Sequence, residues 1–273
     1  MEARATSASL RHGGRRLGYI VYPSPAAAPG IPLILIHGFM AHAHWWDAVA
    51  PYLAENRKVV AIDLAGMGDS DPQSPYRYAT FVDDVLAILD TLRIERCAIA
   101  GHSFGGLIAG LFCAAHGARV ARFIAIDSNL GVFSQRANVD TSVNRRYYPT
   151  LEAALSRFRL VPPSLAADPV ISDHIARRSV VRHPEGWTWK FDPKIVPDLS
   201  QDDKALDLAD ISVPTDYIYG QFSDIATSAL VEQVTARLPQ LRHVISIPEC
   251  NHHTMVEQPI ALVALIRFLL QQD

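Results

Sequence analysis

The sequence is poor in cysteine and has no excess of charge of either sign. Only three cysteines occur in 273 residues, and they do not have the spacing of metal ligands. An odd number of distant cysteines argues against a disulfide framework and suits a reducing, cytoplasmic compartment. The 25 basic residues oppose 28 acidic ones, a formal net charge of −3. Because this balance gives no attraction to nucleic acid or to an anionic membrane, we expect neither as a partner.

Long apolar runs are also missing. The apolar stretch at residues 31–40 is too short to span a bilayer. The first 16 residues contain four arginines and no apolar run, so we expect no signal peptide there. Hydrophobic residues nevertheless make up 49% of the chain. A chain of this length and composition can bury a large core in one enlarged domain.

Apolar runs typical of buried strands alternate with amphipathic stretches typical of helices. Strands are predicted at 17–22, 31–36, 57–64, 97–100, 123–126, 215–219 and 242–247. Helices are predicted at 45–56, 80–92, 107–116, 226–238 and 259–270. Thr80 is expected to cap the helix at 80–92. This alternation predicts an α/β fold with a mostly parallel, doubly wound sheet.

The alternation is interrupted between residues 134 and 197. This segment is rich in arginine, and helical patches at 151–158 and 170–178 are broken by prolines. The simplest interpretation is a helical cap, 134–197, inserted over one end of the sheet. Residues 1–133 and 198–273 then form the α/β core.

The sharpest local signal is Gly101-His102-Ser103-Phe104-Gly105-Gly106, between a predicted strand and a predicted helix. This is the nucleophile-elbow pattern, in which a serine occupies a tight, strained turn and small neighbours let strand and helix approach. The helix N-terminus beneath the hydroxyl favours developing negative charge. A glycine-rich turn with an incidental serine is the structural alternative, but the placement weighs against it. Ser103 is therefore the predicted nucleophile.

A catalytic serine needs a base, and the base needs an orienting acid. Asp224 ends a predicted strand, and His252 and His253 follow the last predicted strand. Because the carboxyl ends of parallel strands meet at one edge of a sheet, we expect these residues to converge on Ser103.

With these residues the chain resembles the α/β-hydrolase family over nearly its whole length outside the cap. The resemblance rests on the elbow, the Asp224 and His252 segments, and two turns that begin at His37 and Asp63. In this family the histidine stands five residues before the glutamate of a Glu-x-Pro tail, which selects His252 over His253. Some members carry the acid at the position of Asp127, but the spacing of Asp224 from Gly220 favours Asp224.

The resemblance also implies the remaining parts of an active site. Backbone N–H groups of Phe39 and Phe104 would form the oxyanion hole, with Met40 as the alternative to Phe39. Met40, Trp187 and Trp189 are candidates for the substrate pocket, although the cap aromatics could equally hold the cap to the core. Asp63 and Asp69 are expected to hold loop backbone. His42 and His44 lack accompanying carboxylates or cysteines, so no metal is expected.

A Ser/His/Asp triad transfers an acyl group to water and needs no cofactor. We therefore expect a small-molecule carboxylic-ester hydrolase. A serine nucleophile argues against the related epoxide hydrolases and dehalogenases, which use an aspartate. A C–C bond hydrolase of ring-cleavage diketones and a thioesterase use the same triad and stay open. A non-catalytic ligand receptor on the same scaffold stays open too, as does a homodimer.

Overall fold

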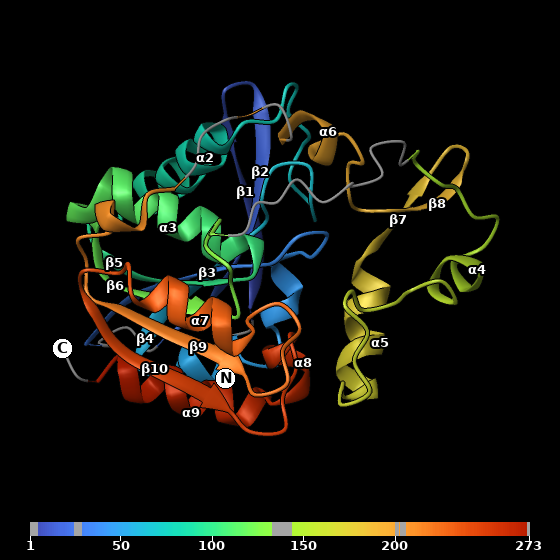
Figure 1. Ribbon diagram of the computed structural model, residues 1–273. Helices are drawn as coiled ribbons and strands as arrows, with labels where there is room; N and C mark the ends of the chain where they lie inside the picture. The colour runs from blue at the N-terminus through green and yellow to red at the C-terminus, as the bar shows by residue number, and fades with distance from the viewer. Residues whose placement is uncertain (1–4, 25–28, 133–143, 200–201, 203–205, 272–273) are drawn as a thin grey trace.

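The computed structural model describes residues 5–24, 29–132, 144–199, 202 and 206–271. These residues form an eight-stranded sheet in the order β1-β2-β4-β3-β5-β6-β9-β10 (Figure 1). The strands are β1 (Thr6–His12), β2 (Arg15–Tyr22), β3 (Gly30–Ile36), β4 (Arg57–Ile62), β5 (Cys97–His102), β6 (Val120–Ile126), β9 (Thr215–Gly220) and β10 (Leu241–Ile247). β2 pairs antiparallel with β1 and with β4, and all other neighbours are parallel. The predicted mostly parallel α/β sheet is confirmed.

Both faces of the sheet are buried, because its central strands are mostly apolar on both sides. In β3, Ile34 and Ile36 pack into one hydrophobic cluster and Leu33 and Leu35 into the other, as the two-residue period of a strand requires. One cluster includes α2 (Tyr78–Thr91), α3 (Phe104–His116) and α7 (Ser228–Thr235). The other includes α1 (Ala50–Leu53) and α9 (Pro259–Leu269). Figure 1 shows α2 and α3 on the opposite side of the sheet from α9.

The strand order creates a crevice at one edge of the sheet. The chain passes from β3 to β4 on one side and then crosses to β5 on the other side of β3. Loops that leave the carboxyl ends of β3 and β5 therefore diverge, and such a point is where α/β sheets bind ligands. The elbow serine and the predicted oxyanion loop both lie at these carboxyl ends.

The inserted segment projects to one side of the sheet (Figure 1). Its described elements are α4 (Leu151–Leu155), α5 (Pro169–Arg178), β7 (Val180–His183), β8 (Gly186–Trp189) and α6 (Ile195–Leu199). β7 and β8 form an antiparallel pair, so the cap is not wholly helical as expected. Residues 134–143 of the predicted cap lie outside the described residues. The Asp192 carboxylate accepts a hydrogen bond from Tyr76 Oη at 2.9 Å, which ties the end of the cap to the core.

Two predicted helices differ in detail. The helix expected at 45–56 is instead a 3-10 turn, η1 (Ala43–Trp46), followed by α1. Pro51 has no N–H to continue a preceding helix but fits the first turn of a new one. α2 begins at Tyr78 with Arg77 as its N-cap, so Thr80 lies inside the helix and does not cap it. Within the described part of the chain, no helix combines the length and the apolarity needed to cross a membrane.

Candidate active site

Ser103 connects β5 to α3 in a backbone conformation that is costly for a residue with a side chain. Its φ is +52° and its ψ is −120°, and such strain persists only where the surroundings enforce it. The backbone is held on both sides of the side chain. Ser103 N–H donates to the carbonyl of Ile126 at 2.9 Å, and the Ser128 hydroxyl donates to the Ser103 carbonyl at 2.7 Å. The predicted elbow is thus present in its geometry.

Two glycines of the elbow are required by close backbone contacts. A Cβ atom on Gly101 would lie 2.3 Å from the carbonyl oxygen of Gly105. A Cβ atom on Gly105 would lie 2.3 Å from the carbonyl oxygen of His37. Neither backbone can give way without displacing a strand or the helix, so the small residues of the motif set how closely α3 packs on β3 and β5.

His252 is paired with a buried carboxylate. Its Nδ1 lies 2.7 Å from Oδ1 of Asp127, and both side chains are almost completely buried. Asp127 directly follows β6 and is fully buried. It also accepts hydrogen bonds from the Ser223 hydroxyl at 2.6 Å and from Gly220 N–H at 2.8 Å. The Asp127 carboxylate is therefore held by two donors from the β9 loop while it faces the His252 ring.

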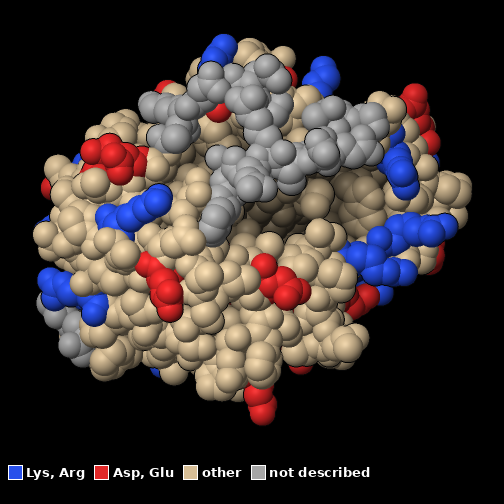
Figure 2. Space-filling view, viewed as in Figure 1, with Lys and Arg blue, Asp and Glu red and all other residues tan. Residues whose placement is uncertain are grey.

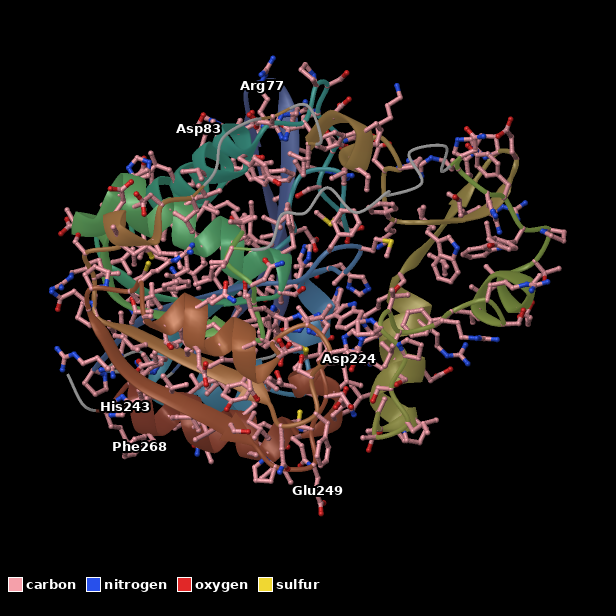
Figure 3. The ribbon with its side chains drawn as sticks, in the orientation of Figure 1. Arg77, Asp83, Asp224, His243, Glu249 and Phe268 are labelled. Atoms are coloured by element: carbon pink, nitrogen blue, oxygen red, sulfur yellow. The ribbon has the colours of Figure 1, made fainter. Side chains whose placement is uncertain are left out.

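Asp224 is not placed where the sequence analysis expected it. Its side chain is exposed in the loop that follows β9 (Figure 3). Among the described residues it makes no hydrogen bond or ion pair. The prediction that Asp224 is the partner of His252 was therefore wrong. The alternative, Asp127, holds that position. The physical reason lies in the β9 loop, which turns Ser223 inward to Asp127 and leaves the next side chain outside.

The loop that carries His252 is fixed by a glutamate five residues later. Glu257 is buried, and its two carboxylate oxygens accept hydrogen bonds from the N–H groups of Asn251 and His253, which flank His252. This contact gives a physical reason for the Glu-x-Pro tail, and it agrees with the choice of His252. His253 points elsewhere, and its Nε2 lies 2.9 Å from the carbonyl oxygen of Pro162 in the cap.

Three other histidines near the site are held neutral by burial. Burial lowers the pKa of His37 and of His253 to about 4. It also lowers the pKa of His102 well below its usual value, with the neighbouring His252 and His253 adding to the effect. These neutral neighbours neither supply nor withdraw protons near pH 7. Among the described histidines that line the cavity, His252 is the one with a carboxylate partner.

Ser103 and His252 line one small cavity of about 150 Å³. Phe39, Met40 and Trp45 contribute to its wall from the core, and Phe158, Arg159 and Val161 contribute from the cap. Among the described residues, no hydrogen bond joins the Ser103 hydroxyl to His252. Catalytic hydrogen bonds in unliganded enzymes are often long and shorten when substrate binds. The cap residues of this wall were not identified from the sequence, because the insertion carries no motif.

The predicted oxyanion donors are available. Neither Phe39 nor Phe104 uses its backbone N–H in a hydrogen bond among the described residues. Phe104 N–H belongs to the first turn of α3, where backbone donors have no partner within the helix. The two phenyl rings pack edge to face, with centroids 5.7 Å apart, which ties the β3 loop to the elbow. Met40, the alternative donor, is 44% exposed.

A second cavity, of about 610 Å³, borders the first and lies between the cap and the core. Met40 lines both cavities, and Trp189 lines the larger one. Trp187 lines neither of them. Its ring instead lies beside Arg182, whose guanidinium carbon is 5.9 Å from the ring centroid, so its predicted place in the substrate pocket is not supported.

The turn after β4 has the structural role expected of it. Asp63 accepts hydrogen bonds from Ala43 N–H at 2.7 Å and from Asp69 N–H at 3.0 Å. Burial raises the Asp63 pKa to about 6, although these two donors oppose the shift. The Asp69 carboxylate lies 2.6 Å from Lys190 Nζ, which connects the turn to the cap.

Two groups of side chains in the described ranges have the composition of metal ligands. His102, His252 and His253 form one, and it coincides with the site just described. The other comprises His44, Asp47 and His174. There Asp47 Oδ2 already lies 2.8 Å from His44 Nδ1 and 2.7 Å from His174 Nε2. The cationic Arg178 is 3.6 Å from the same oxygen, and its charge opposes the binding of a further cation.

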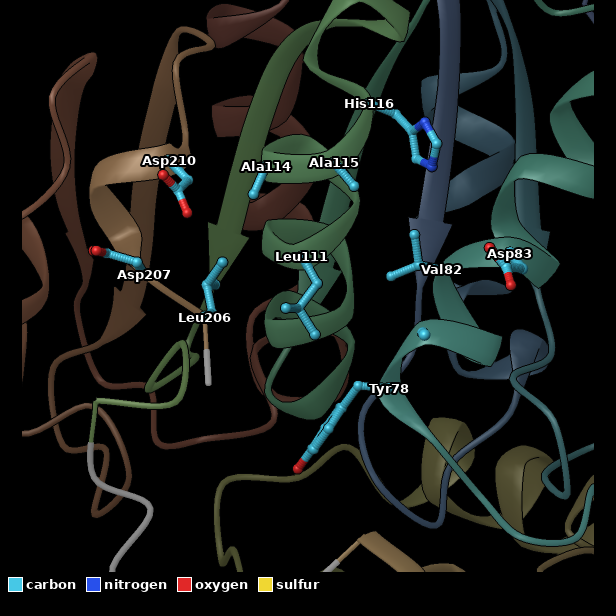
Figure 4. A pocket seen from close by; sticks show the side chains of 11 residues that line it. Tyr78, Val82, Asp83, Leu111, Ala114, Ala115, His116, Leu206, Asp207 and Asp210 are labelled. Carbon is cyan, nitrogen blue, oxygen red and sulfur yellow. The ribbon is translucent and has the colours of Figure 1, made fainter. Parts of the chain in front are cut away.

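Another cavity, of about 330 Å³, lies between α2 and α3, away from Ser103 (Figure 4). Its polar side chains include Tyr78, Asp83, His116 and Asp207. The close-up shows these groups spread around the rim and not directed at one point. Nothing in this lining pairs a nucleophile with a base, so the crevice at Ser103 is the candidate active site.

Comparison with known proteins agrees with the geometry. Residues 31–162 match the family model described as "alpha/beta hydrolase fold". A human "Serine hydrolase-like protein" is 32% identical over 116 residues, 41% of this chain and 57% of the relative. A "2-hydroxymuconate semialdehyde hydrolase" from Pseudomonas sp. (strain CF600) is 38% identical over 105 residues, 36% of this chain and 37% of the relative. The matched region thus covers less than two thirds of these relatives.

One solved structure shares its fold with nearly the whole of this chain. An "E-2-(Acetamidomethylene)succinate Hydrolase" superposes with a TM-score of 0.83, covering 98% of this chain and 100% of the other. Its sequence is 17% identical, so this likeness concerns the fold alone. The matched sequence region includes the elbow and Asp127, but His252 lies beyond it.

Proposed function

Because the chain belongs to the α/β-hydrolase fold family, we propose that it is a serine hydrolase that cleaves a small carboxylic ester through an acyl-enzyme. Ser103 is the nucleophile, His252 the base and then the acid, and Asp127 the orienting carboxylate. One observation carries the proposal. A strained elbow serine lines the same cavity of about 150 Å³ as a histidine whose other ring nitrogen is 2.7 Å from a buried carboxylate.

The reaction has two steps. In the first, the Ser103 oxygen attacks the ester carbonyl while His252 Nε2 takes the hydroxyl proton. The tetrahedral intermediate collapses, His252 returns that proton to the leaving alkoxide, and an acyl-enzyme and an alcohol result. In the second, water loses a proton to His252 and attacks the acyl carbon. The bond to the Ser103 oxygen breaks, His252 returns the proton to that oxygen, and the acid and free Ser103 result. Asp127 holds Nδ1 throughout, so that Nε2 is the nitrogen that accepts the proton.

The tetrahedral intermediates place a negative charge on the former carbonyl oxygen. The N–H groups of Phe39 and Phe104, which have no partner among the described residues, would donate to it. Donors of this kind are each worth on the order of 3 kcal/mol in the transition state. The groups named here supply the nucleophile, the base and the oxyanion donors, and no step of this proposal requires a cofactor.

Hydrolysis of p-nitrophenyl esters with acyl chains from acetate to octanoate tests the proposal. We expect the wild type to turn over at least the shorter esters, with an optimum chain length that reports cavity depth. Ser103→Ala should lose about 10³-fold or more in kcat while keeping its circular dichroism and melting temperature. Turnover by folded Ser103→Ala at the wild-type rate would overturn the proposal. A fluorophosphonate probe, which needs an activated serine but no particular acyl group, should label the wild type and not the variant.

A C–C bond hydrolase is the second candidate, and the similarity to the Pseudomonas semialdehyde hydrolase over 105 residues favours it. The same three residues would serve, with a carbon leaving group in place of an alkoxide. Fluorophosphonate labelling without turnover of any p-nitrophenyl ester, together with cleavage of a ring-fission diketone, would select this reaction. A thioesterase would be identified by turnover of acyl thioesters alone, and a receptor by ligand binding without labelling. A cytoplasmic location is part of the proposal, because all three cysteines are unpaired.

A further inference from the structure

The larger cavity beside Ser103 has a charged lining of one sign. Among the described residues that line it, none is acidic and five are basic: Arg145, Arg146, Arg157, Arg159 and Lys190. Figure 2 shows the hollow on this face, with Lys and Arg side chains gathered along its cap side. The protein as a whole carries a formal net charge of −3. The positive lining is therefore a local concentration and not a reflection of the overall composition.

Within the part of the chain that the structure describes, four of these five positive charges lack an acidic partner. Lys190 is paired with Asp69 at 2.6 Å. The four arginines have no acidic partner among the described residues. Arg145 donates to the carbonyl of Trp189 at 3.3 Å and Arg159 to the carbonyl of Ser156 at 3.0 Å, contacts that leave their charges uncompensated. By contrast, the exposed Arg177 forms an ion pair with Asp173, at a nitrogen–oxygen distance of 2.7 Å.

The rest of the lining is apolar and aromatic. Phe158, Trp189 and Phe191 line the same cavity as the arginines. A ligand that fits this lining has a hydrocarbon body and an anionic end. Guanidinium groups bind carboxylate and phosphate oxygens with charge-assisted hydrogen bonds, often in pairs.

The two cavities share a boundary, which orients such a ligand. Arg159, Phe158, Met40 and Val161 line both of them. A substrate with its carbonyl at Ser103 therefore extends past Arg159 into the larger cavity. Its anionic group then lies at the end remote from the bond that is cleaved.

We propose that the substrate of this enzyme carries an anionic oxygen group, a carboxylate or a phosphate, which binds to Arg157, Arg159 and the neighbouring Arg145 and Arg146. The proposal rests on the function proposed above and specifies its substrate class. In the carboxylate case the enzyme cleaves a half-ester of a dicarboxylic acid. In the phosphate case the anion belongs to a phosphorylated leaving group.

Matched substrates separate the charge from the shape. The p-nitrophenyl half-ester of adipic acid differs from p-nitrophenyl hexanoate by a carboxylate in place of a methyl group. We expect kcat/KM for the half-ester to exceed that for the hexanoate by about tenfold. Raising the salt concentration from 0.05 to 0.5 M should reduce this ratio, since exposed arginines are screened at the higher concentration. A second pair, butyryl-coenzyme A and the butyryl thioester of N-acetylcysteamine, tests the phosphate in the same way.

Variants connect the ratio to the named arginines. The double variant Arg157→Gln/Arg159→Gln should bring the half-ester to hexanoate ratio toward one, and Arg157→Lys/Arg159→Lys should retain most of it. Arg177→Gln removes one positive charge from the cap outside the cavity and should keep the wild-type ratio. The proposal would be overturned if, for both substrate pairs, the wild type showed a ratio of one or less and the double variant left that ratio unchanged.

Binding measurements distinguish this failure from failure of the proposed function. Ser103→Ala should bind the adipate half-ester more tightly than the hexanoate in isothermal titration, whether or not the wild type cleaves either ester. Equal affinity of folded Ser103→Ala for both members of each pair overturns the anionic substrate class. Wild type that binds the half-ester more tightly but hydrolyses no ester or thioester overturns the hydrolytic function and keeps the anion site.

Discussion

Nδ1 of His252 lies 2.7 Å from Oδ1 of Asp127, although 125 positions separate the two residues in the sequence. The contact joins the loop after β10 to the residue that ends β6. Since β6 lies beside β5 in the sheet, it also brings the carboxylate next to the strand that carries Ser103. The chemistry proposed for this protein depends on this contact, and so do the two predictions that follow.

Asp127→Asn should lower kcat by about 10³- to 10⁴-fold, because an amide does not hold the imidazole in the tautomer that leaves Nε2 free to accept a proton. Asp224→Asn makes the same chemical change at an exposed side chain and should alter kcat by less than about twofold. Both are measured with the best p-nitrophenyl ester, after melting curves establish that each variant is folded. The reverse order of effects would return the acid role to Asp224.

Ser223 contacts the carboxylate of the proposed triad. Its hydroxyl donates to Asp127 at 2.6 Å and accepts from Ala226 N–H at 2.9 Å. Ser223→Ala should lower kcat by about tenfold and the free energy of unfolding by about 1–2 kcal/mol. KM should stay near its wild-type value, because Ser223 does not line the cavity of Ser103. Ser223→Thr keeps the hydroxyl and should recover most of kcat. A fall in stability alone, with kcat unchanged, would assign Ser223 a purely structural role.

Gly105→Ala should destabilise the protein by about 3 kcal/mol or more, because its Cβ would lie 2.3 Å from the His37 carbonyl oxygen. Gly117→Ala is the matched control. There the new Cβ would meet Ser212 at 3.4 Å, an ordinary van der Waals distance. Its effect should stay within about 1 kcal/mol. Urea denaturation of both variants measures the difference, and equal stabilities would show that the elbow tolerates a wider separation of α3 from β3.

Acid should destabilise the fold between pH 6.5 and about 4. Burial depresses the pKa values of His37, His102 and His253 in the folded state. The unfolded chain binds these protons near pH 6.5 and the folded chain does not, so stability is full above pH 6.5 and falls as the pH drops. Asp63 opposes this trend. Its pKa is raised to about 6 in the folded state, and its contribution is largest below pH 3.8 and lost as the pH rises to 6.

His42 is a fourth histidine with a pKa lowered by burial, and Asp84 is a second aspartate with a raised pKa. Four histidines outweigh two aspartates, so the net slope of stability against pH keeps the sign of the histidines. His253→Gln should reduce this slope of the free energy of unfolding against pH by about 1.4 kcal/mol per pH unit between pH 6 and 4.5. That is the effect of one proton taken up on unfolding. Urea midpoints of the wild type and the variant at pH 8, 6, 5 and 4.5 measure both slopes. Parallel curves for the two proteins would show that His253 takes up its proton equally in the folded and the unfolded state.

The sequence alone determined the sheet and the strained elbow at Ser103, because their signals are local. Continuous apolar runs such as Leu33 to Ile36 can only be buried on two faces, and the glycines that flank Ser103 stand within one six-residue motif. Gly101 meets Gly105, four positions on, although Gly105 itself meets the distant His37. The choice of His252 followed from a similarly short spacing to Glu257, whose carboxylate binds the N–H groups on both sides of that histidine. The positive lining of the larger cavity was visible only as a scatter of arginines.

The tertiary structure decided which carboxylate meets His252. Asp127 and Asp224 follow neighbouring strands, β6 and β9, at the same edge of the sheet, so strand order does not separate them. The difference lies in the path of the chain after Gly220. Gly220 packs closely against the loop that carries His252. A Cβ atom on Gly220 would lie 1.9 Å from the Asn251 carbonyl oxygen. Gly220 N–H and the Ser223 hydroxyl then bind Asp127, and Asp224 is left in solvent. Contacts between loops distant in sequence fix this path, and no short pattern encodes them.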